Sequence, residues 1–178
     1  DRIGTEYHRW LREESDSIGL KKDQDFSNFI SRNFTVFGQH YLTLHNATKK
    51  TSAGLEHVCY NSDRGFTLQM MLMLAPVRVD DSEEIARKKF SIVSRFLDIL
   101  LAWRTWNGRS IAYSTVQYSM FSIMRSIRGL ACSNLAGYLY EFLDKENETF
   151  EGEQRVRLNQ QNRVLFQLLL ARITDYVE

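Results

Sequence analysis

The chain has 178 residues, 43% of them hydrophobic and 25% charged, which is the balance of a folded soluble protein. A chain of this length buries roughly 70% of its unfolded surface, so it needs no disulfide or metal ion to fold. Its net charge of +1 excludes a global electrostatic attraction to nucleic acid or to a membrane surface.

Helix-breaking residues are scarce in this chain. Pro76 is the only proline, where an average usage near 5% gives about nine. The chain also carries three Trp, eight Tyr and 11 Phe residues. This composition favours long uninterrupted helices over a β-rich chain full of turns.

The first half of the chain predicts two helices and a connection. Residues 7–14 form a short helix, and Asp23 or Asp25 caps a second helix that continues to about Lys49. Residues 51–63 are polar and contain Gly54, which predicts a connection with at most one turn. The apolar residues of the second helix recur in steps of three and four: Phe26, Phe29, Ile30, Phe34, Phe37, Tyr41 and Leu44.

Residues 66–74 are apolar on every side, and Pro76 closes the run. Periodicity does not separate a buried helix from a buried strand in so short a segment. The methionines and leucines favour the helix.

The clearest helix begins at Asp81, where the spacing of Asp81 and Glu84 resembles a capping box. Asn107 and Gly108 then turn the chain into another helix, which Gly129 ends in a left-handed cap. A further helix opens at Ser133 or Asn134, and the last one lies near the end of the chain. The predicted core positions of these helices are Ile85, Phe90, Val93, Leu97, Leu100, Trp103, Tyr113, Val116, Met120, Ile123, Ile127, Leu165, Leu168, Leu169, Ile173 and Tyr176.

These elements predict an all-α protein, an orthogonal or irregular bundle of six to seven helices in a single helical domain over residues 1–178. The chain begins at Asp1 without a methionine and ends at Glu178 within a helical pattern, so we expect a piece of a longer multidomain protein. Cys59 and Cys132 form no CxxC pair and are interpreted as buried thiols of a reducing compartment. No apolar run of about 18 residues and no signal peptide occur, which predicts a cytoplasmic protein without a membrane partner.

The patterns that support catalysis or cofactor binding are absent from the sequence. The four histidines form no pair with metal-ligand spacing, and the glycines form neither of the known phosphate-binding loops. A nucleophile elbow of the G-x-S-x-G type is also missing. We therefore predict no catalytic residue, no metal and no cofactor, and no enzyme activity for this chain alone.

Basic residues are concentrated between residues 87 and 128. This segment contains eight basic residues against one acid, a net charge of +7. Two interpretations are open: solvated faces with ion pairs, or a surface that contacts phosphates. The candidate nucleic-acid-binding residues lie at the ends of two helices and form two patches if these helices are antiparallel: Arg104, Arg109, Arg125 and Arg128.

A stripe of small residues follows the helix after Asn107, at Thr115, Ser119, Ser122 and Ser126. Small side chains allow a second helix to approach closely. The alternative hypothesis is thus a purely structural or self-associating helical domain without a ligand, and the oligomeric state stays open.

The run FTLQMMLMLA at residues 66–75 and the run LDILLAWRTWNGRSIAYSTVQYSMFSIMRSIRG at residues 97–129 resemble the central helical region of the GmrSD-type restriction endonuclease family. The final NRVLFQLLLARITDYVE and the opening YHRWL are similar to the same region. Members of this family join a ParB/sulfiredoxin-like N-terminal domain with a DGQQR-type motif to the helical region, and many add a His-Asn-His-type nuclease domain.

The resemblance implies a helical connector or interaction domain in a bacterial protein of restriction-modification or phage defence. The parent protein would be a nucleotide-dependent endonuclease, and the partners would be its neighbouring domains and DNA. Both catalytic motifs of the family are missing from this chain, so no catalytic role is carried over. The matching positions include Arg104, Asn107, Arg109 and Arg128.

Overall fold

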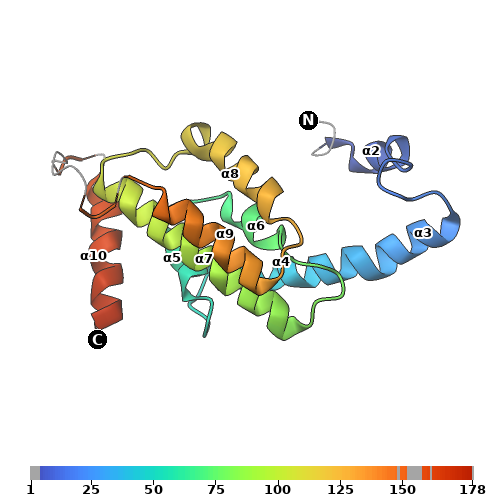
Figure 1. Cartoon of the computed structure of the whole chain (residues 1–178), viewed down its shortest axis with the longest axis horizontal. Helices are drawn as coiled ribbons and strands as arrows, with labels where there is room; N and C mark the ends of the chain where they lie inside the picture. Colours follow the sequence, from blue (N-terminus) through green and yellow to red (C-terminus); the bar gives the residue numbers. More distant parts are fainter. Residues whose placement is uncertain (1–4, 148, 152–157, 161, 178) are drawn as a thin grey trace. The chain divides into compact units, whose positions relative to one another are not determined.

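The computed structural model describes residues 5–147, 149–151, 158–160 and 162–177, and every regular element in these ranges is a helix (Figure 1). The predicted all-α class is confirmed. Within these ranges the chain forms eight helices when three consecutive segments are taken as one continuous helix, slightly more than predicted. The chain packs as two compact units, residues 1–39 and 40–178. The prediction of one domain over the whole chain stays a prediction.

The first unit contains α2 (Tyr7–Glu13) and α3 (Asp23–Asn28). Asp25 caps α3, because its carboxylate accepts hydrogen bonds from the backbone N–H groups of Lys21 and Lys22 at 3.1 and 2.9 Å. The helix continues without a break as a π-helical segment, η1 (Phe29–Phe34), and then as α4 (Thr35–Ala47), so the predicted helix to about residue 49 is confirmed.

The second unit contains a helix that the sequence did not predict. Residues expected to form a connection instead form α5 (Glu56–Asp63). Only Val58 among its buried residues is apolar, and the other two are His57 and Asn61. The periodicity of apolar residues does not reveal such a helix, because polar side chains occupy its inner face. Gly65 then ends the helix with a φ of 73°.

Helix α6 (Gln69–Leu74) lies within the predicted apolar run and is helical as expected. The connection from α6 to α7 is held by Lys89, which is only 1% exposed. Its Nζ donates hydrogen bonds to the Pro76 carbonyl oxygen at 2.8 Å and to Asp81 Oδ2 at 2.6 Å. The carboxylate of Asp81 also accepts from the backbone N–H of Arg78 at 2.8 Å. This lysine therefore belongs to the interior and not to the basic surface.

Helix α7 (Glu83–Trp106) has 24 residues and packs against α5, α6, α9 and α10. Its N-cap is Ser82, whose hydroxyl accepts from the Ile85 backbone N–H, so the predicted cap at Asp81 is wrong by one residue. The predicted core is confirmed at Phe90, Val93, Leu97 and Leu100, but Trp103 is only half-buried and Ile85 is 42% exposed. This residue lies in the first turn of α7, at the amino end of the helix.

Three further helices complete the second unit: α8 (Tyr113–Ile127), α9 (Cys132–Asp144) and α10 (Arg163–Val177). Helix α8 packs on α6, while α9 lies along α7 (Figure 1). The amino end of α10 contacts the carboxyl end of α7, where the ring centroids of Trp106 and Phe166 are 6.3 Å apart. Cys59 and Cys132 are free thiols and half-buried, so the prediction of fully buried thiols is wrong.

Candidate functional site

The first two of the predicted arginines, Arg104 and Arg109, lie where α7 ends. Gly108 has a φ of 65°, a left-handed conformation that glycine adopts without a steric penalty. Two backbone hydrogen bonds close the turn, from Gly108 N–H to the Thr105 oxygen at 3.1 Å and from Arg109 N–H to the Arg104 oxygen at 2.8 Å. These bonds form the Schellman motif that ends many helices. The predicted turn at Asn107 and Gly108 is confirmed.

The side chain of Arg104 is used within this turn. Its Nε and Nη2 donate hydrogen bonds to the Ser110 carbonyl oxygen at 3.1 and 2.8 Å. Asn107 Nδ2 donates to the carbonyl oxygens of Trp103 and Thr149, both at 2.9 Å. Arg104 therefore fixes the start of the connection from α7 to α8, and Asn107 ties the end of α7 to the segment after α9. The side chain of Arg109 is exposed.

The other two predicted arginines, Arg125 and Arg128, lie at the carboxyl end of α8. Both are exposed, and neither has a hydrogen-bond or ion-pair partner among the described residues. A third arginine, Arg78, lies beside this end of α8, because its Nε donates to the carbonyl oxygen of Gly129 at 2.7 Å. Sequence spacing alone does not reveal this third arginine, since it lies on the connection from α6 to α7, 51 positions from Gly129.

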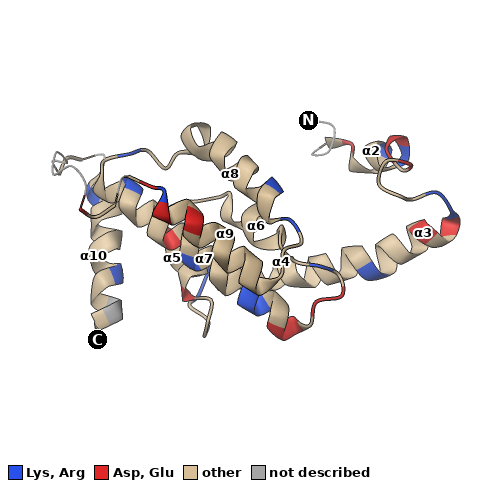
Figure 2. Ribbon diagram, viewed as in Figure 1, with Lys and Arg blue, Asp and Glu red and all other residues tan. Residues whose placement is uncertain are grey.

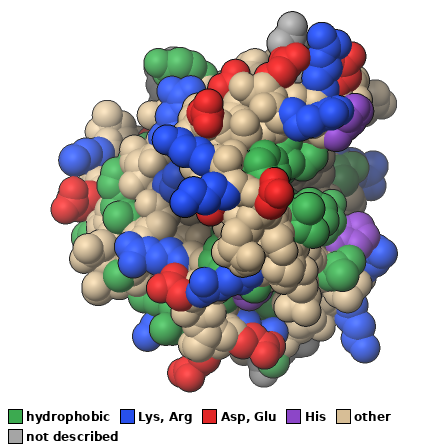
Figure 3. Space-filling view, turned by 90° about the vertical axis from the view of Figure 1, so that its right-hand side faces the viewer, with side chains coloured by type: hydrophobic (Ala, Val, Ile, Leu, Met, Phe, Trp, Pro, Cys, Tyr) green, Lys and Arg blue, Asp and Glu red, His purple; other side chains and the backbone are tan. Residues whose placement is uncertain are grey.

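The four predicted arginines therefore form two groups at opposite ends of α8. A helix of 15 residues is roughly 22 Å long, which separates the groups by more than a Debye length at physiological salt. Figure 2 shows α8 without any acidic residue and with its single basic residue near its carboxyl end. On the face drawn in Figure 3, Lys and Arg side chains are interspersed with acidic and hydrophobic ones.

A buried ionic cluster that the sequence did not reveal is centred on Asp98, in the middle of α7. Its carboxylate accepts hydrogen bonds from His57 Nδ1 at 2.8 Å, from Arg64 Nη1 at 2.7 Å and from Arg172 Nε at 3.2 Å. Asp98 and Arg64 are both buried. The cluster joins α5, α7 and α10, helices whose residues are separated by up to 74 positions in the chain.

Two arginines at the edge of the cluster make further contacts. Arg95 Nε donates to His57 Nε2 at 3.3 Å, which fits the tautomer whose Nδ1–H donates a hydrogen bond to the Asp98 carboxylate. The guanidinium of Arg172 lies 4.5 Å from the ring centroid of Tyr60, a cation–π contact.

The pair of His57 and Asp98 has the geometry of a carboxylate that orients a histidine, as in acid–base catalysis. Catalysis also requires the second ring nitrogen to face a nucleophile or a substrate. Here that nitrogen accepts from Arg95, and no serine or cysteine hydrogen-bonds to His57 within the described ranges. The arrangement is that of a structural ionic cluster.

The charge of Asp98 is maintained by its surroundings. Burial acts to raise the pKa of this carboxyl, but the hydrogen bond from His57 and the positive charges of Arg64 and Arg172 outweigh it and hold the pKa below its ordinary value of 3.8. The pKa of Asp81 is also lowered: burial opposes the shift, and the bonds from Lys89 and Arg78 prevail. Both carboxyls are thus ionised in the folded protein at neutral pH.

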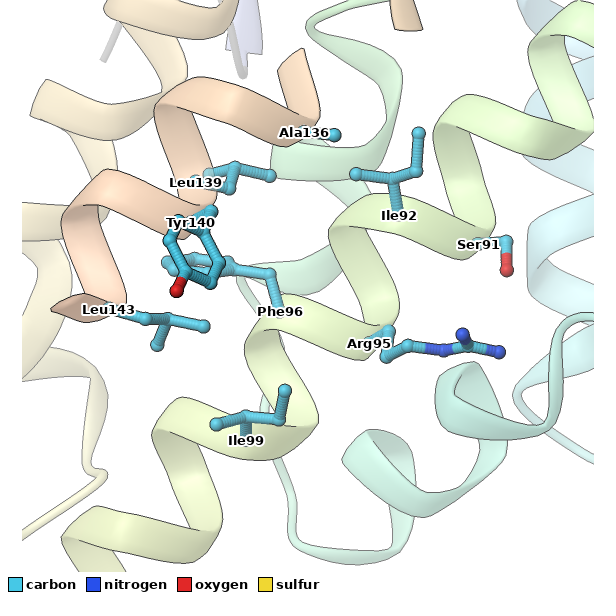
Figure 4. Close-up of a pocket in the computed structure, with 9 residues that line it drawn as sticks. All are labelled: Ser91, Ile92, Arg95, Phe96, Ile99, Ala136, Leu139, Tyr140 and Leu143. Atoms are coloured by element: carbon cyan, nitrogen blue, oxygen red, sulfur yellow. The ribbon is translucent and has the colours of Figure 1, made fainter. Parts of the chain in front are cut away.

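An apolar groove lies between α7 and α9 and has a volume of about 220 Å³. Figure 4 shows Ile92, Ile99, Leu139 and Leu143 around it, with the ring of Tyr140 beside them. The guanidinium of Arg95 extends away from α9 in this view, in agreement with its bond to His57. Arg95 also lines the groove, but its guanidinium group is bonded to His57.

A metal centre and a membrane span are not found in the part of the chain that the structure describes. No group of three or more His, Cys, Asp or Glu residues there is arranged to hold a metal ion. No helix there is long and apolar enough to cross a lipid bilayer.

The fold and the site define a helical bundle whose central helix carries a buried ionic cluster and whose basic surface residues lie at the two ends of α8. Searches against models of protein families, against curated proteins and against solved structures find no match to this chain.

Proposed function

We propose that the chain is a helical connector and interaction module of a GmrSD-like protein for modification-dependent restriction or phage defence. In this proposal the module has no catalytic role of its own, and exposed arginines contact DNA phosphates. Catalysis belongs to other domains of the parent protein, a nucleotide-dependent endonuclease. The resemblance of the sequence to the central helical region of that family motivates the proposal.

The observation that carries the DNA contact is the state of Arg125 and Arg128. Both guanidinium groups are exposed and lack partners among the described residues, so neither is already engaged in an ion pair. A guanidinium group presents donors in a planar fork that matches two phosphate oxygens. The next helix, α9, begins four residues after Arg128, and its N-cap Ala131 supplies no side-chain acceptor. The positive end of the α9 helix dipole adds to the attraction for phosphate.

Arg104 and Arg109 contribute to a second contact at the opposite end of α8. Arg109 is exposed, while Arg104 uses two of its nitrogens to hold the turn. In the proposal Arg109 makes the phosphate contact, and Arg104 supplies charge and fixes the turn beside it.

The role as a connector is supported by the surface of α10. Its apolar residues Phe166, Leu170, Ile173 and Val177 recur in steps of four, three and four, and the last three are exposed. The buried residue Leu169 and the half-buried Arg172 hold the helix to α5 and α7, and Phe166 packs on Trp106 of α7. An exposed apolar stripe of this kind is typical of a surface that another domain covers.

Fluorescence anisotropy of labelled duplex DNA, titrated with the protein at low and at physiological salt, tests the proposal. We expect binding whose affinity falls steeply with salt, because phosphate contacts release counterions. A chain that fails to bind duplex DNA even at low salt has no such surface, and the DNA part of the proposal is then wrong.

The alternative function is self-association. All four small residues of the stripe on α8 are exposed, so no helix of the described chain packs on them: Thr115, Ser119, Ser122 and Ser126. Sedimentation velocity at several protein concentrations distinguishes the two. A dimer that is lost in Ser119→Lys favours self-association, and a monomer at all concentrations excludes it.

A further inference from the structure

Helix α8 carries an aromatic ring in the middle of its solvent-facing side. Tyr118 is 87% exposed, whereas the buried residues Val116, Met120, Ile123 and Ile127 hold the helix to the rest of the protein. With 3.6 residues in each helical turn, position 118 lies nearly opposite the mean direction of these four buried residues. The ring of Tyr118 therefore faces solvent and is open to a ligand.

Arg125 lies on the same side of α8 as this ring. Seven residues make nearly two full turns, so Arg125 follows Tyr118 along the helix at a separation of roughly 10.5 Å. Arg125 is exposed and, like Arg128, has no partner among the described residues. Arg78 adds a third guanidinium group beside the carboxyl end of the helix, where its Nε is bonded to the Gly129 carbonyl oxygen. An aromatic ring is thus followed by a cluster of arginines along one side of α8.

Helix α8 itself has no carboxylate that offsets this cluster. The chain contains no Asp or Glu between Asp98 and Glu141, a segment that includes all of α8 and the first two turns of α9. Figure 2 shows the same absence of acidic residues along the ribbon of α8. On the connection that carries Arg78, the carboxylate of Asp81 is bonded to Lys89. The surface along α8 therefore attracts phosphate groups without an acid of its own to repel them.

We propose that this side of α8 binds single-stranded DNA, with a base stacked on the ring of Tyr118 and phosphates bound by Arg125 and Arg128. The inference rests on the proposed DNA contact of these arginines and names its substrate class. A separation of roughly 10.5 Å corresponds to about three nucleotide steps of 3.4 Å, so the ring and the arginines reach different nucleotides of one strand. Aromatic rings beside positive charge are the means by which proteins bind single strands without sequence preference.

The ring of Tyr118 favours a single strand over a duplex for a geometric reason. In a duplex each base is stacked between its neighbours, and only its edges are open in the grooves. A single strand exposes the faces of its bases, and the stacking of one base on an aromatic side chain strengthens binding roughly fivefold to 150-fold. Electrostatic attraction alone gives the opposite preference, because a duplex has the higher density of phosphates. A preference for the single strand therefore reports the stacked base.

The test uses fluorescence anisotropy of the full chain with three labelled DNAs: a single strand, the duplex of the same length, and the same single strand with abasic sites. We expect the single strand to bind more tightly than the duplex and about tenfold more tightly than the abasic strand, which keeps its phosphates. Tyr118→Ala should weaken binding of the intact strand about tenfold and leave the abasic strand and the duplex unchanged. Tyr118→Phe keeps the ring and should bind like the parent chain.

Tyr140→Ala is the matched control, because Tyr140 is 71% exposed on a different helix, α9, and should bind all three DNAs like the parent chain. Salt-dependent duplex binding together with unchanged single-strand binding in Tyr118→Ala overturns this inference and leaves the proposed phosphate contact standing. The absence of binding to every DNA at low salt overturns both. A dimer that forms without DNA and dissociates in Tyr118→Ala assigns a second copy of the chain to this surface, and also overturns the inference.

Discussion

Arginine residues serve two contrasting purposes in two regions of this molecule. Around Asp98, Arg64 and Arg172 direct their guanidinium groups to a buried carboxylate and thereby join three helices. At the carboxyl end of α8, Arg125 and Arg128 are exposed and have no partner among the described residues. The comparison shows that a basic residue is available to a ligand only where the fold places no acid beside it. That acid can lie far away in the sequence, as Asp98 does from Arg172.

The largest effect is expected in the buried region. Asp98→Ala removes the shared acceptor of His57, Arg64 and Arg172 and leaves buried positive charge without a partner. We expect the free energy of unfolding in urea to fall by about 3–5 kcal/mol, as for the loss of one partner of a buried ion pair. Asp63→Ala, an exposed acid at the end of α5, is the control and should change stability little. Equal stability of the two variants contradicts the structural role of the cluster.

A smaller loss is expected at the second buried ion pair. Lys89→Met keeps most of the side-chain volume but removes the donor to Asp81 and to the Pro76 carbonyl oxygen. The unfolding free energy should fall by about 2 kcal/mol, since hydrogen bonds to charged groups contribute roughly 1.5–3 kcal/mol. Lys88→Met, at the neighbouring exposed lysine, is the control in the same unfolding measurement. If the unfolding free energy falls equally in both variants, the bonds of Lys89 do not stabilise the connection between α6 and α7.

The pH dependence of the unfolding free energy depends on the buried carboxyls and not on the exposed arginines. The folded-state pKa values of Asp98 and Asp81 lie below their ordinary value, so these carboxyls stabilise the fold above pH 3.8 and lose this contribution as the pH falls through the folded-state values. Protonation then removes the negative charge that pairs with Arg64 and with Lys89. Urea unfolding between neutral and strongly acid pH should show the decline. The decline should be shallower in Asp81→Asn, and an identical profile in that variant rules out a contribution from Asp81.

The smallest effect on stability is expected at the exposed arginines. The double variant Arg125→Gln/Arg128→Gln removes no contact within the described residues. Its unfolding free energy should stay within about 0.5 kcal/mol of the parent value, as for most surface substitutions. A loss comparable to that of Lys89→Met means that these side chains are part of the fold.

Most of the fold follows from local patterns in the sequence. The steps of three and four in the apolar residues predict α7, α8 and the helix that includes α4, and Gly108 marks the turn correctly. These features depend on residues close together in the chain. Helix α5 was missed for the opposite reason, because its inner face is formed by His57 and Asn61, whose partners lie on α7.

The ionic cluster could not be predicted for the same physical reason. The partners of Asp98 come from 34 to 74 residues away, and no local spacing encodes such a contact. One signal was present: Asp98 is the only acid in a basic segment and is flanked by apolar residues on both sides. Charged residues are almost never fully buried unless they are paired, so a lone acid on an apolar helix face indicates a distant cation. The basic segment was visible in the sequence, but its composition does not separate the exposed Arg125 and Arg128 from the buried Lys89.

The most direct test of the contrast between the two regions is the salt dependence of duplex DNA binding by the Arg125→Gln/Arg128→Gln variant, compared with the parent chain by fluorescence anisotropy. Each phosphate contact contributes about 0.9 to the slope of log affinity against log salt concentration. We expect the variant to remain folded and this slope to fall by about 1.8, the contribution of two contacts. A folded variant with the parent slope means that Arg125 and Arg128 make no phosphate contact, which contradicts the proposed DNA surface.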